Sequence, residues 1–103
     1  MADYRNVDPG DLHLPTGRQD GAVEDRYLDQ VRRFGANTTG MPPIEVTEGK
    51  DGALMINNGV TRATRIHYLA PGQLVPVVII EKRPKAKFSS LRCVREVPPP
   101  RVP

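Results

Sequence analysis

The chain has 103 residues, of which 38% are hydrophobic and 26% are charged, with one cysteine and a net charge of +3. This length allows one domain with one modest core and excludes two. The lone Cys93 excludes an internal disulfide and a cysteine-rich zinc site, and no apolar run approaches the roughly 20 residues that a membrane-spanning helix needs.

The basic character belongs to the C-terminal segment. Residues 82–103 carry seven Lys or Arg and one Glu, hence a net charge of +6, so residues 1–81 carry −3. We therefore expect a domain over 1–81 and a basic, Pro-rich extension over 82–103. The polar N-terminus lacks the layout of a signal peptide, so a cytoplasmic location without membrane contact is expected.

The first elements are predicted between a turn and a helix cap. Residues 8–10, Asp-Pro-Gly, indicate a turn. The polar and apolar alternation over 11–14 then predicts a short edge strand with Leu12 and Leu14 facing inward. Asp20 follows in a polar loop, where it is expected to cap the next helix.

An amphipathic helix is predicted from Ala22 to Gly35. Its apolar residues recur at spacings of four, four and three, with Leu28 beside them: Val23, Tyr27, Val31 and Phe34. After a turn-rich connection, Ile44 and Val46 alternate with polar residues and predict a strand over 44–48. Residues 49–52 predict a hairpin turn and residues 53–56 its second strand.

A second helix and a closing strand complete the predicted domain. Asn57, Asn58 and Gly59 are expected to form a tight turn before a helix that stops ahead of Pro71. Ala63, Ile66 and Leu69 should share one side of that helix. Residues 75–80 are almost wholly apolar and predict a strand buried on both faces, with Pro76 near its start.

Beyond this strand, Phe88 to Val97 could add one more strand, and residues 98–100 are three prolines that favour an extended end. The order strand, helix, strand, strand, helix, strand predicts an α+β domain with two helices packed on a small mixed sheet.

The junction over 56–65 is the best candidate binding site. A strand that ends just before the start of a helix leaves free backbone N–H groups at the turn. Thr61 adds a hydroxyl, and Arg62 adds a guanidinium in the first helical turn, so the junction is suited to an anion.

The order of these motifs resembles the N-terminal ParB domain and its sulfiredoxin relatives, over roughly residues 4–81. The residues that carry the resemblance are Gly17-Arg18, Phe34-Gly35, Pro43-Ile44-Glu45-Val46, Gly59-x-Thr61-Arg62-Ala63 and the strand Leu74-Val75-Pro76-Val77-Val78-Ile79.

The resemblance implies a phosphate site. In chromosome-partitioning members a Gly-Glu-Arg-Arg motif helps to hold nucleotide phosphates, and Gly59 and Arg62 match its first and fourth positions. In sulfiredoxins the turn reads Gly-Cys-His-Arg with a nucleophilic Cys, where this chain has Val60. Sulfiredoxin chemistry is therefore not expected. Arg18 lies in the family's other phosphate-side loop, although the usual Asn-Pro-x-x-Pro-Arg reads Leu-Pro-Thr-Gly-Arg here.

The predicted function is a non-catalytic ParB-like module that binds a nucleotide or a nucleic acid. Its expected ligand-binding residues are Arg18, Asn58, Gly59, Thr61, Arg62 and Arg65. The same residues also allow a purely structural interpretation. Arg62 and Arg65 would then be solvated charges or ion-pair partners of Glu45 or Glu48, and Thr61 would be a helix cap. His13 and His67 lack metal-ligand spacing, and no catalytic residue or metal ligand is assigned.

Two alternatives remain open at this stage. An enzyme of nuclease or phosphohydrolase type would use Mg²⁺ held by acidic residues near the turn: Asp20, Glu45, Glu48 and Asp51. A protein-interaction or regulatory module would present its Pro-rich end in extended form to an unidentified protein partner. The basic extension could also attract nucleic acid, with Phe88 as its one stacking residue.

Overall fold

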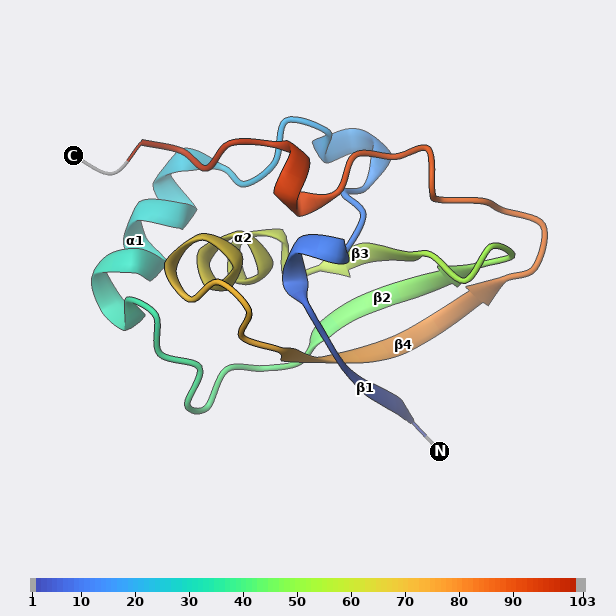
Figure 1. Ribbon diagram of the computed structural model, residues 1–103, viewed down its shortest axis with the longest axis horizontal. Helices are drawn as coiled ribbons and strands as arrows, with labels where there is room; N and C mark the ends of the chain where they lie inside the picture. The colour runs from blue at the N-terminus through green and yellow to red at the C-terminus, as the bar shows by residue number, and fades with distance from the viewer. Residues whose placement is uncertain (1, 102–103) are drawn as a thin grey trace.

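In a computed structural model, which describes residues 2–101, the chain forms a four-stranded mixed sheet and two α-helices (Figure 1). The elements are β1 (Asp3–Val7), α1 (Glu24–Phe34), β2 (Ile44–Gly49), β3 (Leu54–Asn58), α2 (Val60–Leu69) and β4 (Val75–Arg83). The expected α+β class and the order β-α-β-β-α-β are confirmed.

The sheet has the order β1-β4-β2-β3. β4 lies in its interior, antiparallel to β1 and parallel to β2, while β2 and β3 form the predicted antiparallel hairpin. The parallel pair runs from Ile44 opposite Val77 to Gly49 opposite Arg83. The start of β2 therefore lies beside the helices, and its end projects away from them (Figure 1).

The first strand is not where the alternation placed it. β1 spans Asp3–Val7, and residues 9–11 form a 3₁₀ turn whose first residue is Pro9. Leu12 and Leu14 are buried as expected. Between them His13 forms single β-bridges to Met55 on one side and Cys93 on the other, because the extended residues 12–14 lie between β3 and the C-terminal segment.

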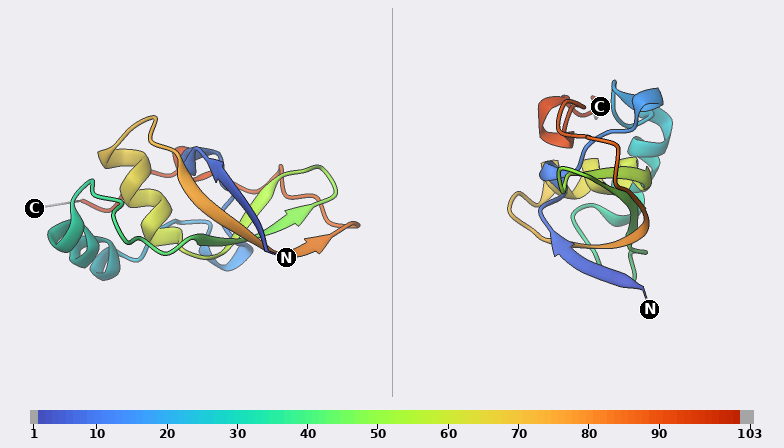
Figure 2. Two further views of the ribbon diagram at one scale, coloured as in Figure 1. Left: turned by 90° about the horizontal axis from the view of Figure 1, so that it is seen from below. Right: turned by 90° about the vertical axis from the view of Figure 1, so that its right-hand side faces the viewer.

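Helix α1 ends at Gly35 as predicted, with φ of 52° at this glycine. The cap prediction was wrong, since Val23 rather than Asp20 stands at the N-cap and no side chain caps the helix. α1 contacts α2 rather than the sheet (Figure 2). Only Tyr27 of its apolar residues is fully buried, while Val23 and Phe34 stay largely exposed.

The core lies between α2 and the sheet. Ala63 and Ile66 of α2 are fully buried there, as the helical spacing predicted, whereas Leu69 is 38% exposed. The remaining members come from the sheet, the N-terminal segment and the C-terminal segment: Leu12, Leu14, Ile44, Val46, Ile56, Val60, Val75, Val77, Ile79, Val94 and Val97.

The prediction that β4 is buried on both faces was wrong. Val75, Val77 and Ile79 face the core, but the alternate residues Pro76, Val78 and Ile80 are half-buried or exposed. No described helix covers that second face, so the apolar run reflects the interior position of β4 in the sheet rather than two packed layers (Figure 2).

The C-terminal segment packs back onto the domain. The additional strand over Phe88 to Val97 is not formed; instead a 3₁₀ turn covers Val94–Glu96, and Val94 and Val97 join the core. The Tyr68 hydroxyl donates a hydrogen bond of 2.5 Å to the Val97 carbonyl. Of the Pro-rich end, residues 102 and 103 lie outside the described residues. No helix within 2–101 combines the length and apolar character needed to cross a bilayer.

Candidate anion-binding pocket

The turn between β3 and α2 consists of one glycine. Gly59 has φ of 120°, a conformation that side chains disfavour, and a Cβ atom at this position would lie 3.1 Å from the buried Ile44 side chain. It would also lie 2.9 Å from Nη2 of Arg62. Gly59 therefore lets the chain reverse against β2 and lets the Arg62 side chain pass close to the backbone.

The two asparagines before it belong to the strand. β3 continues to Asn58, so the expected three-residue turn was wrong. Asn57 accepts a hydrogen bond of 2.7 Å from the Thr47 hydroxyl, and the Asn58 amide donates one of 3.1 Å to Glu45. These cross-strand bonds from β2 hold two residues of low strand propensity in extended conformation.

Helix α2 begins with unsatisfied donors. Its first backbone bond runs from the Ala63 N–H to the Gly59 carbonyl, and no side chain caps the helix. Within residues 2–101 the N–H groups of Val60, Thr61 and Arg62 have no hydrogen-bond acceptor. Thr61 lies inside the first turn and is not the cap. The N-terminus of α2 thus carries free hydrogen-bond donors and the positive pole of the helix dipole.

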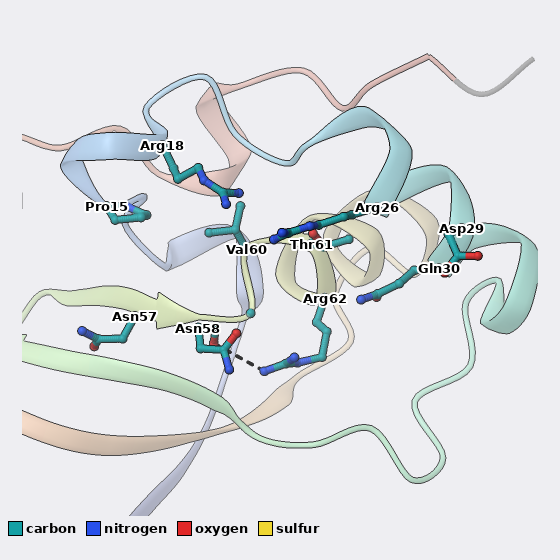
Figure 3. A pocket seen from close by; sticks show the side chains of 11 residues that line it. Pro15, Arg18, Arg26, Asp29, Gln30, Asn57, Asn58, Val60, Thr61 and Arg62 are labelled. Carbon is teal, nitrogen blue, oxygen red and sulfur yellow. Dashed lines mark hydrogen bonds between the residues drawn. The ribbon is translucent and has the colours of Figure 1, made fainter.

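A pocket of about 380 Å³ opens over this helix start (Figure 3). Five of the six predicted ligand-binding residues line it: Arg18, Asn58, Gly59, Thr61 and Arg62. The other lining residues come from the N-terminal loop, from α1, from the end of β3 and from the start of α2: Pro15, Arg26, Asp29, Gln30, Asn57 and Val60.

Three guanidinium groups make the pocket electropositive. Arg18 comes from the N-terminal loop, Arg26 from α1 and Arg62 from α2, and all three border the same cavity (Figure 3). No described residue forms an ion pair with any of them. The one carboxylate in the lining, Asp29, pairs with Arg33 at 3.1 Å. The cationic charge of the pocket is therefore largely uncompensated.

Of the three, only Arg62 has a buried guanidinium nitrogen that lacks a hydrogen-bond partner among the described residues. Its Nη2 donates only to two carbonyls, those of Pro43 at 3.3 Å and Asn58 at 3.4 Å. Its Nε is buried and, within the described chain, has no hydrogen-bond partner. Burial lowers the pKa of this guanidinium, and the nearby Glu45 carboxylate partly offsets that shift by raising the pKa. An anion in the pocket would supply the missing compensation.

The structure does not bring Arg65 into this pocket. Its side chain is buried beneath the connection between α1 and β2, where Nη1 donates to the carbonyls of Gly35 at 2.7 Å and Asn37 at 2.9 Å. The guanidinium also lies over the Phe34 ring, 5.4 Å from its centroid. Burial lowers the pKa of Arg65, and the charge of Arg62 adds to the lowering. Arg65 thus holds the end of α1 in place.

Nucleophilic and metal-binding groups are scarce around the turn. Val60, at the sulfiredoxin nucleophile position, is 8% exposed and packs into the core. Cys93 lies beside His13, 3.6 Å from its Nδ1, and does not line the pocket; burial raises the pKa of its thiol. Among residues 2–101 no three His, Cys, Asp or Glu side chains converge on a point where a metal ion fits.

Sequence reasoning missed Arg26 and Gln30. They stand four residues apart, on one stripe of α1 that the apolar spacing does not mark. Their pairing along that stripe is the only sequence signal. It becomes informative once α1 is known to lie against α2, because that packing brings the stripe to the start of α2.

The chain matches no known protein family and no curated protein sequence.

Proposed function

We propose that this chain is a non-catalytic binding module of the ParB and sulfiredoxin type, which holds a phosphate-bearing ligand, a nucleotide or a nucleic acid, at the Gly59–Arg62 turn. The observation that carries the proposal is the convergence of Arg18, Arg26 and Arg62 on the uncapped start of α2. Free backbone N–H groups and planar guanidinium groups together suit a tetrahedral oxyanion.

The fold assignment rests on element order and on the turn itself. The order β-α-β-β-α-β, the glycine before the second helix and the arginine three residues later all agree with the family pattern. The closing strand with Pro76 second follows at the matching place.

Binding fits the pocket better than catalysis does. Hydrolysis of a phosphate ester assisted by Mg²⁺ needs several carboxylates near the phosphate. The lining of this pocket supplies only Asp29, whose carboxylate contacts Arg33. Asp51, one of the acidic residues considered for Mg²⁺, instead accepts hydrogen bonds from the backbone N–H groups of Phe88 and Ser89.

The test is to titrate the intact chain with inorganic pyrophosphate, nucleoside triphosphates and a short DNA at low ionic strength and to measure binding by calorimetry. Arg62→Ala should weaken binding by about 10-fold to 100-fold, because a hydrogen bond to a charged group contributes about 1.5–3 kcal/mol. Arg18→Gln should act in the same direction.

Arg32→Ala is the matched control, since Arg32 is an exposed residue of α1 that does not line the pocket. It removes the same charge and should leave the affinity nearly unchanged. Absence of binding to every probe, or equal affinities for the Arg62→Ala and Arg32→Ala variants, would overturn the proposal.

A further inference from the structure

A second cationic surface lies at the opposite end of the sheet. Residues 49–52, at the end of β2 and in the turn after it, project past the helices together with residues 82–87, at the end of β4 and after it (Figure 1). We call these two segments the basic tip. Its five cationic side chains are all exposed: Lys50, Lys82, Arg83, Lys85 and Lys87. Glu45, beside the pocket, and Lys50 are five strand residues apart, about 17 Å at the usual rise, so the two surfaces are separate.

The two parts of the basic tip are held together as one unit. The Lys50 N–H donates a hydrogen bond of 2.6 Å to the Ala86 carbonyl. The Asp51 carboxylate accepts from the N–H groups of Phe88 at 3.1 Å and Ser89 at 3.0 Å. The Phe88 side chain is buried, and a Cβ atom on Gly49 would meet both its ring and the Ala86 carbonyl oxygen at under 3.0 Å.

Part of this charge has no counterpart in the protein. Lys82 approaches the carboxylates of Glu48 at 3.8 Å and Asp3 at 4.0 Å, and Arg83 pairs with Glu81. Over residues 2–101, Lys50, Lys85 and Lys87 form no ion pair. Asp51 does not neutralise them through a side-chain contact, because its oxygens are occupied by backbone N–H groups.

We propose that the basic tip is a binding site for the phosphate backbone of duplex nucleic acid, distinct from the pocket at Gly59. Exposed lysines on a preorganised projection suit repeated phosphates, which they contact by charge and without base specificity. Phe88, the aromatic residue expected to stack on a base, is 6% exposed and unavailable. The basic tip therefore has no exposed aromatic residue that could stack on unpaired bases, and this favours a duplex over a single strand.

The experiment measures binding of a fluorescein-labelled 20-base-pair DNA to the intact chain between about 50 and 200 mM salt. Three lysine contacts give a slope of about −2.7 in log K against log salt, so removing them should flatten the slope by that amount. Over this range the affinity of the unmodified chain should fall about 40-fold more than that of a Lys50→Gln, Lys85→Gln, Lys87→Gln variant.

The control is a triple variant with the same loss of charge, Arg32→Gln, Arg92→Gln and Arg101→Gln, at exposed positions outside the tip and outside the pocket. It should keep the slope of the unmodified chain. Equal slopes for the two triple variants would overturn the proposal, since net charge alone would then explain the attraction. Equal affinity for polyglutamate, or for vesicles with 30% phosphatidylserine, would also overturn it and point to another anionic partner.

The outcome is separable from that for the pocket. The lysine variant should bind pyrophosphate as the unmodified chain does, because none of its three positions lines the pocket. If pyrophosphate and nucleoside triphosphates do not bind, and duplex binding does not depend on Arg62, the proposed function is removed and the tip result is left intact. Duplex binding that is abolished by Arg62→Ala and insensitive to the lysines would instead place the nucleic acid at the pocket and overturn the proposal for the tip.

Discussion

Replacement of Gly59 by alanine should destabilise the protein by about 2–6 kcal/mol. The backbone there has φ of 120° and ψ of 19°, and holding a non-glycine residue in such a region costs about 1–3 kcal/mol. The new methyl group would also lie 3.1 Å from two carbons of Ile44, which is fully buried and cannot withdraw. Overpacking of this kind adds about 1–3 kcal/mol, whereas Arg62 can swing away.

Two other glycines separate the backbone cost from the steric cost. Gly72→Ala tests the backbone alone, since its φ is 85° and open space surrounds its Cβ position. Gly17→Ala is the baseline, because its φ is not in that range and its Cβ position is also open. Urea denaturation supplies the three free energies of unfolding, and a loss of about 3 kcal/mol should lower the Gly59→Ala midpoint by about 1–3 M. If Gly59→Ala costs no more than Gly72→Ala, the contact with Ile44 does not constrain the turn.

Two further predictions concern buried and pinned side chains. Arg65→Ala should lower the free energy of unfolding by about 3 kcal/mol or more, because the Gly35 and Asn37 carbonyls lose their donor and a cavity forms; a urea-denaturation loss under about 1 kcal/mol would contradict this. Asp51 has its pKa lowered from 3.8 to about 2, chiefly by the backbone N–H of Ser89. The Asp51 carboxylate therefore binds a proton more readily in the unfolded chain than in the folded one. Its contribution to the free energy of unfolding is complete above about pH 3.8 and is lost as the pH falls toward 2. Urea midpoints over that window should fall less steeply for Asp51→Ala than for the unmodified chain, and parallel curves would refute the assignment.

Local patterns predicted the elements whose burial is periodic. α1 follows from its apolar spacing and from the glycine that ends it, and the hairpin follows from alternation around Asp51-Gly52. The start of α2 also follows from sequence, because a glycine before a helical pattern marks a boundary. Each of these signals acts between residues close in the chain.

Elements set by distant partners could not be predicted in this way. β1 has exposed residues at its three central positions and forms because β4 offers it a free edge. Asn57 and Asn58 have turn propensity, yet Thr47 and Glu45 on the next strand keep them in β3. The exposed face of β4 is apolar as well, and a run of Val and Ile does not reveal whether a second layer packs on that face.

The residues of the candidate pocket divide in the same way, into those that local sequence predicts and those that distant contacts bring there. Gly59, Thr61 and Arg62 are consecutive parts of one local motif, so the sequence alone points to them. Arg26 enters the pocket only through the packing of α1 on α2. Arg65 leaves it for the same reason, because the connection after α1 offers it two carbonyls that no local pattern reveals.

The extended segment around His13 ties together parts of the chain that are made at very different times during synthesis. Backbone bonds join Leu14 to Arg92 and Leu12 to Val94, while His13 pairs with β3 on its other side. A nascent chain therefore cannot complete its core until about eighty residues have followed Leu14 out of the ribosome. Such distant contacts close late and slow the folding of a small domain, so the early-made segment must wait, exposed, for its last partner.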